Sequence, residues 1–82
     1  MAGEPDVKAW VEAMARDLVN HTEAVEVTLV RERGTDVLEL EVDPAEMGRV
    51  IGRQGRTVQA LRTLLRIAGE RHGRSYDLEI LE

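Results

Sequence analysis

Several residue types that build reactive or stacking sites are rare or missing in this 82-residue chain. Cysteine is missing, which excludes disulfides, thiolate nucleophiles and cysteine-ligated zinc. Phenylalanine is also missing, and there is one tryptophan and one tyrosine, so a site that stacks ligands on several aromatic rings is excluded. No apolar run approaches the roughly 18 residues of a membrane helix. The N-terminal segment 1–6 has an acidic balance and does not resemble a signal peptide. We therefore expect a cytoplasmic protein with no membrane partner.

The chain also lacks a recognisable catalytic constellation. Gly48, Gly52 and Gly55 match neither G-x-G-x-x-G nor the P-loop pattern, no lysine follows the last glycine, and no nucleophile and base are paired. The only histidines, His21 and His72, lie far apart and are interpreted as polar residues at helix ends. We expect no enzyme, no cofactor and no metal site.

Charge is distributed unevenly along the chain, whose net charge is -5. Residues 49–74 contain seven arginines and a single acid, Glu70, whereas the rest has four basic residues against fifteen acids. Such a segment attracts phosphates locally while the rest of the surface repels them. Ten of the eleven basic residues are arginine, which favours hydrogen-bonded contacts. Four of these arginines are interpreted as a solvated helix face: Arg62, Arg66, Arg71 and Arg74.

Hydrophobic periodicity predicts a helix followed by a hairpin. Residues 5–20 have the helical period, with a predicted apolar face of Val7, Trp10, Val11, Met14 and Leu18. Alternation predicts a strand over 23–31, with Val25, Val27 and Leu29 on one side. A polar turn at 31–36 leads into a second strand over 37–42, which is expected to bury Leu38, Leu40 and Val42.

Two helices around a glycine turn follow, and then a last strand. Asp43, Pro44 and Glu46 predict a capped helix start with a capping box, and the short helix should run to Ile51. After the turn Gly52-Arg53-Gln54-Gly55, a second helix is predicted with an apolar face of Val58, Leu61, Leu64, Leu65 and Ala68, ending within 69–73. Residues 75–81 again alternate between apolar and polar side chains, which predicts a third strand. The order α-β-β-α-α-β predicts one α+β domain over 1–82, with a core from about 5 to 81 and three helices on one face of a three-stranded sheet.

The glycine turn has a structural and a functional interpretation. Gly52 ends the first helix with a positive φ and Gly55 lets the chain reverse, and this alone explains both glycines. Arg49, Arg53 and Arg56 gather around the turn, however, where the amides that open the second helix also point. Glycines without side chains, free amides and guanidinium groups favour a site that a phosphate backbone approaches closely.

The residues Ile51-Gly52-Arg53-Gln54-Gly55, followed by Val58, resemble the I-G-x-x-G-x-x-[IV] signature of KH domains. Gly48 also fits this pattern, and the small size resembles the bacterial KhpA family. The resemblance implies a type II KH fold whose loop clamps about four single-stranded RNA nucleotides. It also implies a post-transcriptional regulator or RNA chaperone that forms a homodimer, or a heterodimer with a second KH protein of the Jag type.

Within this hypothesis the phosphates meet the amides of 52–55 and the side chains of Arg53 and Arg56, with Arg49 nearby. Gln54 departs from the commonest loop, which has a basic residue or glycine there. Bases are expected in an apolar groove formed by Val50, Ile51 and Val58. Leu38 and Leu40 are adjacent and are interpreted as core.

Two other functions stay open. A protein-protein interaction module with a non-binding loop is consistent with an apolar flank of Ala60 and Ile67 on the second helix, although a broad core face also explains that flank. A DNA-binding helix-turn-helix is disfavoured, because its second helix should open with polar base-reading residues, whereas this helix quickly becomes apolar.

Overall fold

The structure, a computed structural model, describes residues 6–82. Its elements are, in order, α1 (Val7–Leu18), β1 (Glu26–Glu32), β2 (Thr35–Glu41), α2 (Met47–Ile51), α3 (Arg56–His72) and β3 (Tyr76–Ile80). Single 3-10 turns occur at Thr22–Ala24, Pro44–Glu46 and Arg53–Gly55. The predicted α+β class and element order are confirmed. The predicted helix start at Pro5 lies outside the described residues.

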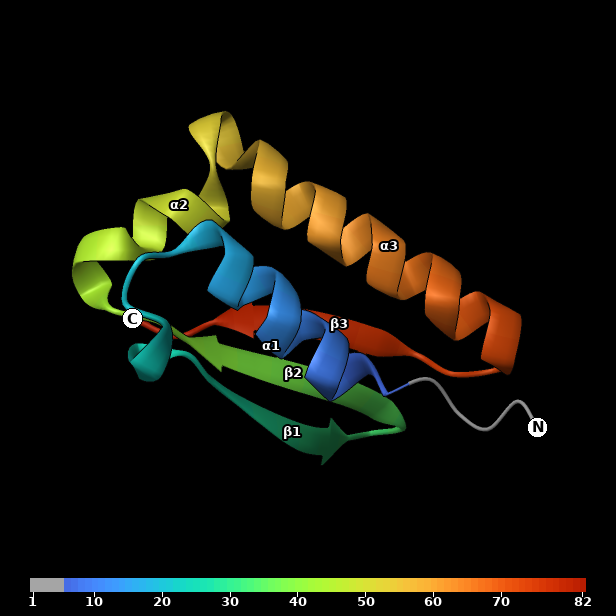
Figure 1. Cartoon of the computed structure of the whole chain (residues 1–82). Coiled ribbons are helices and arrows are strands. Elements are labelled where there is room, and N and C mark those ends of the chain that lie inside the picture. The colour runs from blue at the N-terminus through green and yellow to red at the C-terminus, as the bar shows by residue number, and fades with distance from the viewer. Residues whose placement is uncertain (1–5) are drawn as a thin grey trace.

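The three strands form one sheet in the order β1-β2-β3, and the helices lie on one of its faces (Figure 1). β1 and β2 are antiparallel, with Leu29 opposite Leu38. β2 and β3 are parallel, with Leu38 opposite Leu78. A parallel pair needs a long crossover, and α2 and α3 supply it. This crossover leaves β3 at an edge of the sheet, with α3 packed along it.

The core lies between the sheet and the helices. The largest fully buried side chains come from both layers: Val11, Val50 and Leu65 from the helices, and Leu38, Leu40 and Leu78 from the strands. Two residues of the predicted apolar faces are instead exposed, Leu29 at 48% and Leu64 at 49%. Leu29 is the central residue of β1, whereas the buried Val27 lies nearer the start of the strand.

α1 buries a face that is rotated from the predicted one. Val7 and Val11 are buried as expected, but Ala15 and, directly after the helix, Val19 complete the buried row. Trp10, Met14 and Leu18 are half-buried and pack on the rim of the core.

The Glu46 side chain connects the start of α2 with the chain that follows α1. The predicted capping box would instead have paired it with the Asp43 backbone. Asp43 accepts a hydrogen bond from the Ala45 N–H as a cap should. The Glu46 carboxylate, however, accepts from the backbone N–H groups of Asn20 (2.7 Å) and His21 (2.9 Å), not from Asp43. The hydrogen bond from the His21 backbone N–H, the one from Asn20 and the His21 ring together outweigh burial and lower the pKa of Glu46 below its ordinary value of 4.5.

Asp36 ties the hairpin to the chain entering β3. Its buried carboxylate accepts from Arg31 Nη1 at 3.0 Å and from Arg74 Nη1 at 3.4 Å. Arg74 was predicted on a solvated helix face, but it follows α3 and is only partly exposed. Over residues 6–82, no helix has the length and apolar character needed to cross a membrane.

Candidate nucleic-acid interface

The loop of residues 52–55, between α2 and α3, projects from the body of the molecule (Figure 1). Gly52 has φ 78° and ψ 171°, and its N–H donates to the Gly48 carbonyl at 2.8 Å, which ends α2 as predicted. Gln54 and Gly55 are also left-handed, at φ 58° and 75°. A Cβ on Gly52 would collide with the side chain and backbone nitrogen of Thr57. The loop shape therefore depends most strongly on glycine at position 52.

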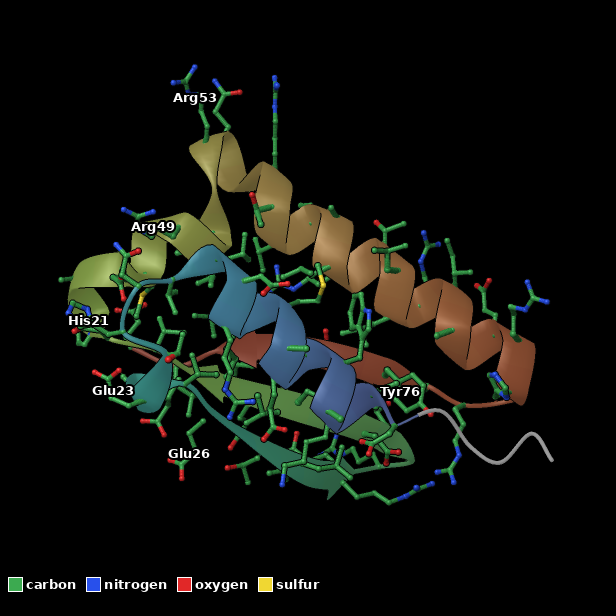
Figure 2. The ribbon with its side chains drawn as sticks, in the orientation of Figure 1. His21, Glu23, Glu26, Arg49, Arg53 and Tyr76 are labelled. Atoms are coloured by element: carbon green, nitrogen blue, oxygen red, sulfur yellow. The ribbon has the colours of Figure 1, made fainter. Side chains whose placement is uncertain are left out.

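Three arginines surround this loop, as predicted. Arg53 extends into solvent at the tip and Arg49 extends from α2 (Figure 2). The guanidinium group of Arg56, in the first turn of α3, donates to Gln54 Oε1 at 3.5 Å. Arg49 Nε lies 3.7 Å from Glu46 Oε2, a weak contact that leaves its side chain 56% exposed. All three guanidinium groups are therefore accessible to a ligand.

Two backbone amides at the tip complete this cationic surface. Within residues 6–82, the N–H groups of Arg53 and Gln54 make no backbone hydrogen bond. The φ values of Gly52 and Gln54 turn this stretch outward, away from the carbonyls of α2. Free N–H groups beside guanidinium groups form a positive site of the kind that holds phosphate oxygens.

The apolar groove predicted from Val50, Ile51 and Val58 is not present as such. Val50 is 0% exposed and Val58 is 7% exposed, so both belong to the core and offer no surface to a base. Leu38 and Leu40 are core residues, as interpreted. Ile51 is half-buried and is the one member of the predicted groove that reaches the surface.

A polar groove between α3 and β3, which the sequence analysis missed, lies further along α3. It measures about 430 Å³ and is lined by Gln59, Arg62, Thr63 and Arg66 from α3 and by Ser75, Tyr76 and Asp77 around the start of β3. Arg62 Nε donates to the Leu78 carbonyl at 3.1 Å. The spacing of the α3 residues by three and four is a signal for one helical face, but the parallel pairing that brings β3 alongside is not visible locally.

The opposite side of α3 borders an apolar hollow. Trp10, Leu64, Leu65 and Ala68 line a pocket of about 420 Å³ between α1 and α3. Leu64 in this lining is 49% exposed, Ile67 on the same helix is 45% exposed, and Ala60, one turn before Leu64, is exposed too. α3 thus separates a polar groove on one side from an apolar strip on the other.

Among residues 6–82, one group of side chains has the composition of a metal site: His21, Asp43 and Glu46. His21 Nδ1 lies 3.1 Å from Glu46 Oε1 and 3.3 Å from Asp43 Oδ2. Both Glu46 oxygens already accept backbone N–H groups. These hydrogen bonds explain the cluster as a clasp between α1 and α2 without an ion.

A three-stranded sheet with a parallel β2–β3 pair, covered on one face by helices and carrying a G-x-x-G loop between two of them, defines a KH domain of type II. Residues 8–80 match the KH domain of KhpA/KhpB, and the chain belongs to this family. The family is one of non-enzymatic binding domains, in agreement with the expectation from the sequence.

Similar proteins align over almost their whole length. The RNA-binding protein KhpA of Aquifex aeolicus is 49% identical over 76 residues, covering 93% of this chain and 96% of the relative. The RNA-binding protein KhpA of Clostridium perfringens is 39% identical over 75 residues, covering 92% and 100%. That of Caldanaerobacter subterraneus subsp. tengcongensis is 39% identical over 71 residues, covering 87% and 95%.

Proposed function

We propose that this protein binds single-stranded RNA, with the phosphate backbone held over the loop of residues 52–55. The observation that carries the proposal is the left-handed turn at Gly52, which presents two free amides between three exposed arginines. The names of the relatives, RNA-binding protein KhpA, support the class of ligand. From the loop, the RNA strand then runs along α3 to the polar groove between α3 and β3. This groove takes the place of the apolar groove that was expected from the sequence.

The charge distribution directs RNA to this side of the molecule. On the sheet face away from the helices, Glu26 pairs with Glu41 across β1 and β2, and Glu39 pairs with Glu79 across β2 and β3. Glu26 and Arg53 lie on opposite sides of the molecule (Figure 2). Like-charged pairs give the open sheet face a negative potential that repels phosphates. RNA therefore approaches the loop side.

The binding test uses fluorescence anisotropy with a labelled pool of single-stranded RNA octamers. A double variant, Arg53→Asp with Gln54→Asp, should abolish binding because carboxylates at the tip repel phosphates. Arg33 is an exposed arginine at the tip of the β1–β2 hairpin, with φ 52°. Arg33→Asp is therefore the control for an arginine-to-aspartate change outside the loop, and it should bind like wild type. Three arginine contacts predict a slope of about -2 for log K against log salt, since each single-strand contact contributes about -0.7.

The outcomes distinguish the proposed function from its alternatives. Equal binding by wild type and by the double variant would refute the loop as the clamp. No binding of RNA by any form of the protein would favour a protein-protein interaction module instead. Tighter binding of a labelled DNA duplex than of the RNA pool would favour the helix-turn-helix interpretation.

We also propose that the protein works as a dimer through the apolar strip on α3, formed by Ala60, Leu64 and Ile67. One KH loop spans about four nucleotides, so joining two domains raises the affinity by avidity. Sedimentation velocity at micromolar concentration should show a species of twice 9.2 kDa, and Ile67→Glu should reduce it to 9.2 kDa. A wild-type species of 9.2 kDa alone contradicts the homodimer, and the same strip is then available to a second KH protein of the Jag type.

The cellular role that fits these properties is that of a cytoplasmic post-transcriptional regulator or RNA chaperone. A short, multivalent contact with phosphates holds many transcripts weakly, and any selectivity comes from the bases in the adjoining groove.

A further inference from the structure

The groove between α3 and β3 contains a guanidinium group that is already held in place. Arg62 Nε donates to the Leu78 carbonyl, and the terminal Nη1 and Nη2 atoms have no hydrogen-bond partner among residues 6–82. Arginine offers one pair of parallel N–H bonds through these two terminal nitrogens. Because the side chain is anchored before a ligand arrives, less rotamer freedom is lost when that pair is used.

The hydrogen bond from Arg62 and a second one at Leu78 prevent another strand from pairing with this edge of the sheet. The Leu78 carbonyl accepts from Arg62, and the Leu78 N–H donates to Asp77 Oδ1 at 2.8 Å. Both outward backbone groups at the centre of β3 are therefore occupied by side chains, and an added peptide strand would have to break these bonds. The groove suits a small planar group better than an extended peptide.

We propose that Arg62 makes this groove prefer guanine among the bases of the bound RNA. The inference rests on the proposed function. Guanine presents two neighbouring acceptors, O6 and N7, which match the two parallel N–H bonds of an arginine. Adenine presents an acceptor beside a donor at that edge, so one arginine N–H would face an N–H of the base. Asp77 lines the same groove and offers a carboxylate to the N–H donors on the other edge of guanine.

The position of the groove fits an RNA strand clamped at the loop. Arg62 lies two turns into α3, about 10 Å along the helix axis from Gly55. The half-buried ring of Tyr76 lines the groove from β3 and offers a surface for the base (Figure 2). The groove volume of about 430 Å³ lies within the range of pockets for small ligands.

The test compares labelled oligouridine octamers that carry a single central guanosine, adenosine, cytidine or 7-deazaguanosine. Wild type should bind the guanosine RNA about five- to tenfold more tightly than the adenosine RNA. Substituting 7-deazaguanosine, which lacks the N7 acceptor, should remove most of this preference. Arg62→Met should bind the guanosine and adenosine RNAs equally, and Arg62→Lys should do so too, because lysine keeps the charge but not the two parallel N–H bonds.

Arg71→Met is the matched control, because Arg71 is an exposed arginine of α3 outside this groove, and it should keep the guanosine preference. Circular dichroism melting establishes that the variants are folded. RNA binding by wild type without a guanosine preference overturns this inference alone, as does a preference that survives in Arg62→Lys. If wild type binds none of the RNAs, the proposed function itself fails and this inference fails with it.

Discussion

Replacement of Gly52 by alanine should be the most damaging of three glycine substitutions around the loop. The backbone of Gly52, at φ 78° and ψ 171°, lies in a region that is essentially restricted to glycine, and another residue there costs about 1–3 kcal/mol. The new Cβ would also collide with the side chain and backbone nitrogen of Thr57. We expect a loss of at least about 2 kcal/mol of unfolding free energy, with strain and collision combined.

Two matched substitutions separate these contributions. A Cβ on Gly55 meets no atom within 4 Å, but its φ of 75° is left-handed, so Gly55→Ala should cost about 1–2 kcal/mol from the backbone alone. Gly48 lies within α2 and a Cβ there also meets nothing within 4 Å, so Gly48→Ala should be neutral or stabilise by up to about 1 kcal/mol.

Thermal unfolding followed by circular dichroism measures the series. Each kcal/mol corresponds to about 4–8 °C in the melting temperature of a domain of this size. Gly52→Ala should therefore melt at least about 8 °C below wild type, Gly55→Ala at an intermediate temperature, and Gly48→Ala at or above wild type. Equal melting temperatures for the Gly52 and Gly55 variants would refute the role of the Thr57 contact in fixing the loop.

Other predictions concern the clasp between the helices and the end of α3. Because the pKa of Glu46 is lowered in the folded protein, its contribution to stability is present above pH 4.5 and is lost as the pH falls through the folded pKa. The melting temperatures of wild type and Glu46→Gln should differ most at neutral pH and converge below about pH 4.5, and a constant difference would contradict this. At the end of α3, a Cβ on Gly69 would lie 2.5 Å from the Arg74 carbonyl oxygen, so Gly69→Ala should lose about 1–3 kcal/mol in urea unfolding. Gly73→Ala, with no neighbour within 4 Å but φ 65°, separates that contact from backbone strain.

Local patterns in the sequence were sufficient to predict the order of the elements. The glycine turn, the alternation around Leu38 and Leu40 and the helical spacing after Gly55 each involve residues close in the chain. The arginines and glycines of residues 49–56 were placed together for the same reason. The structure brings them to one projecting loop, and RNA contact by them stays a prediction.

Features that depend on contacts between distant residues were not predicted. Glu46 binds amides 25 and 26 residues earlier in the chain, a pairing that no local spacing reveals. Leu64 has the right helical phase for the core, but it lines the open pocket between α1 and α3 and is 49% exposed. Val50 appeared as a groove residue because periodicity marks an apolar side without saying whether protein or ligand covers it. The groove of Arg62 and Tyr76 depends on the parallel β2–β3 pairing.

The most direct test of the central claim is a two-dimensional ¹H–¹⁵N NMR titration of the labelled protein with an unlabelled single-stranded RNA tetramer. Contact with phosphates at the loop predicts the largest shift changes at the amides of Gly52, Arg53, Gln54 and Gly55, followed by residues lining the α3–β3 groove. The amides of Glu26 and Glu41 on the open sheet face should not shift. Shift changes centred on that face, with the loop amides unmoved, would contradict the account.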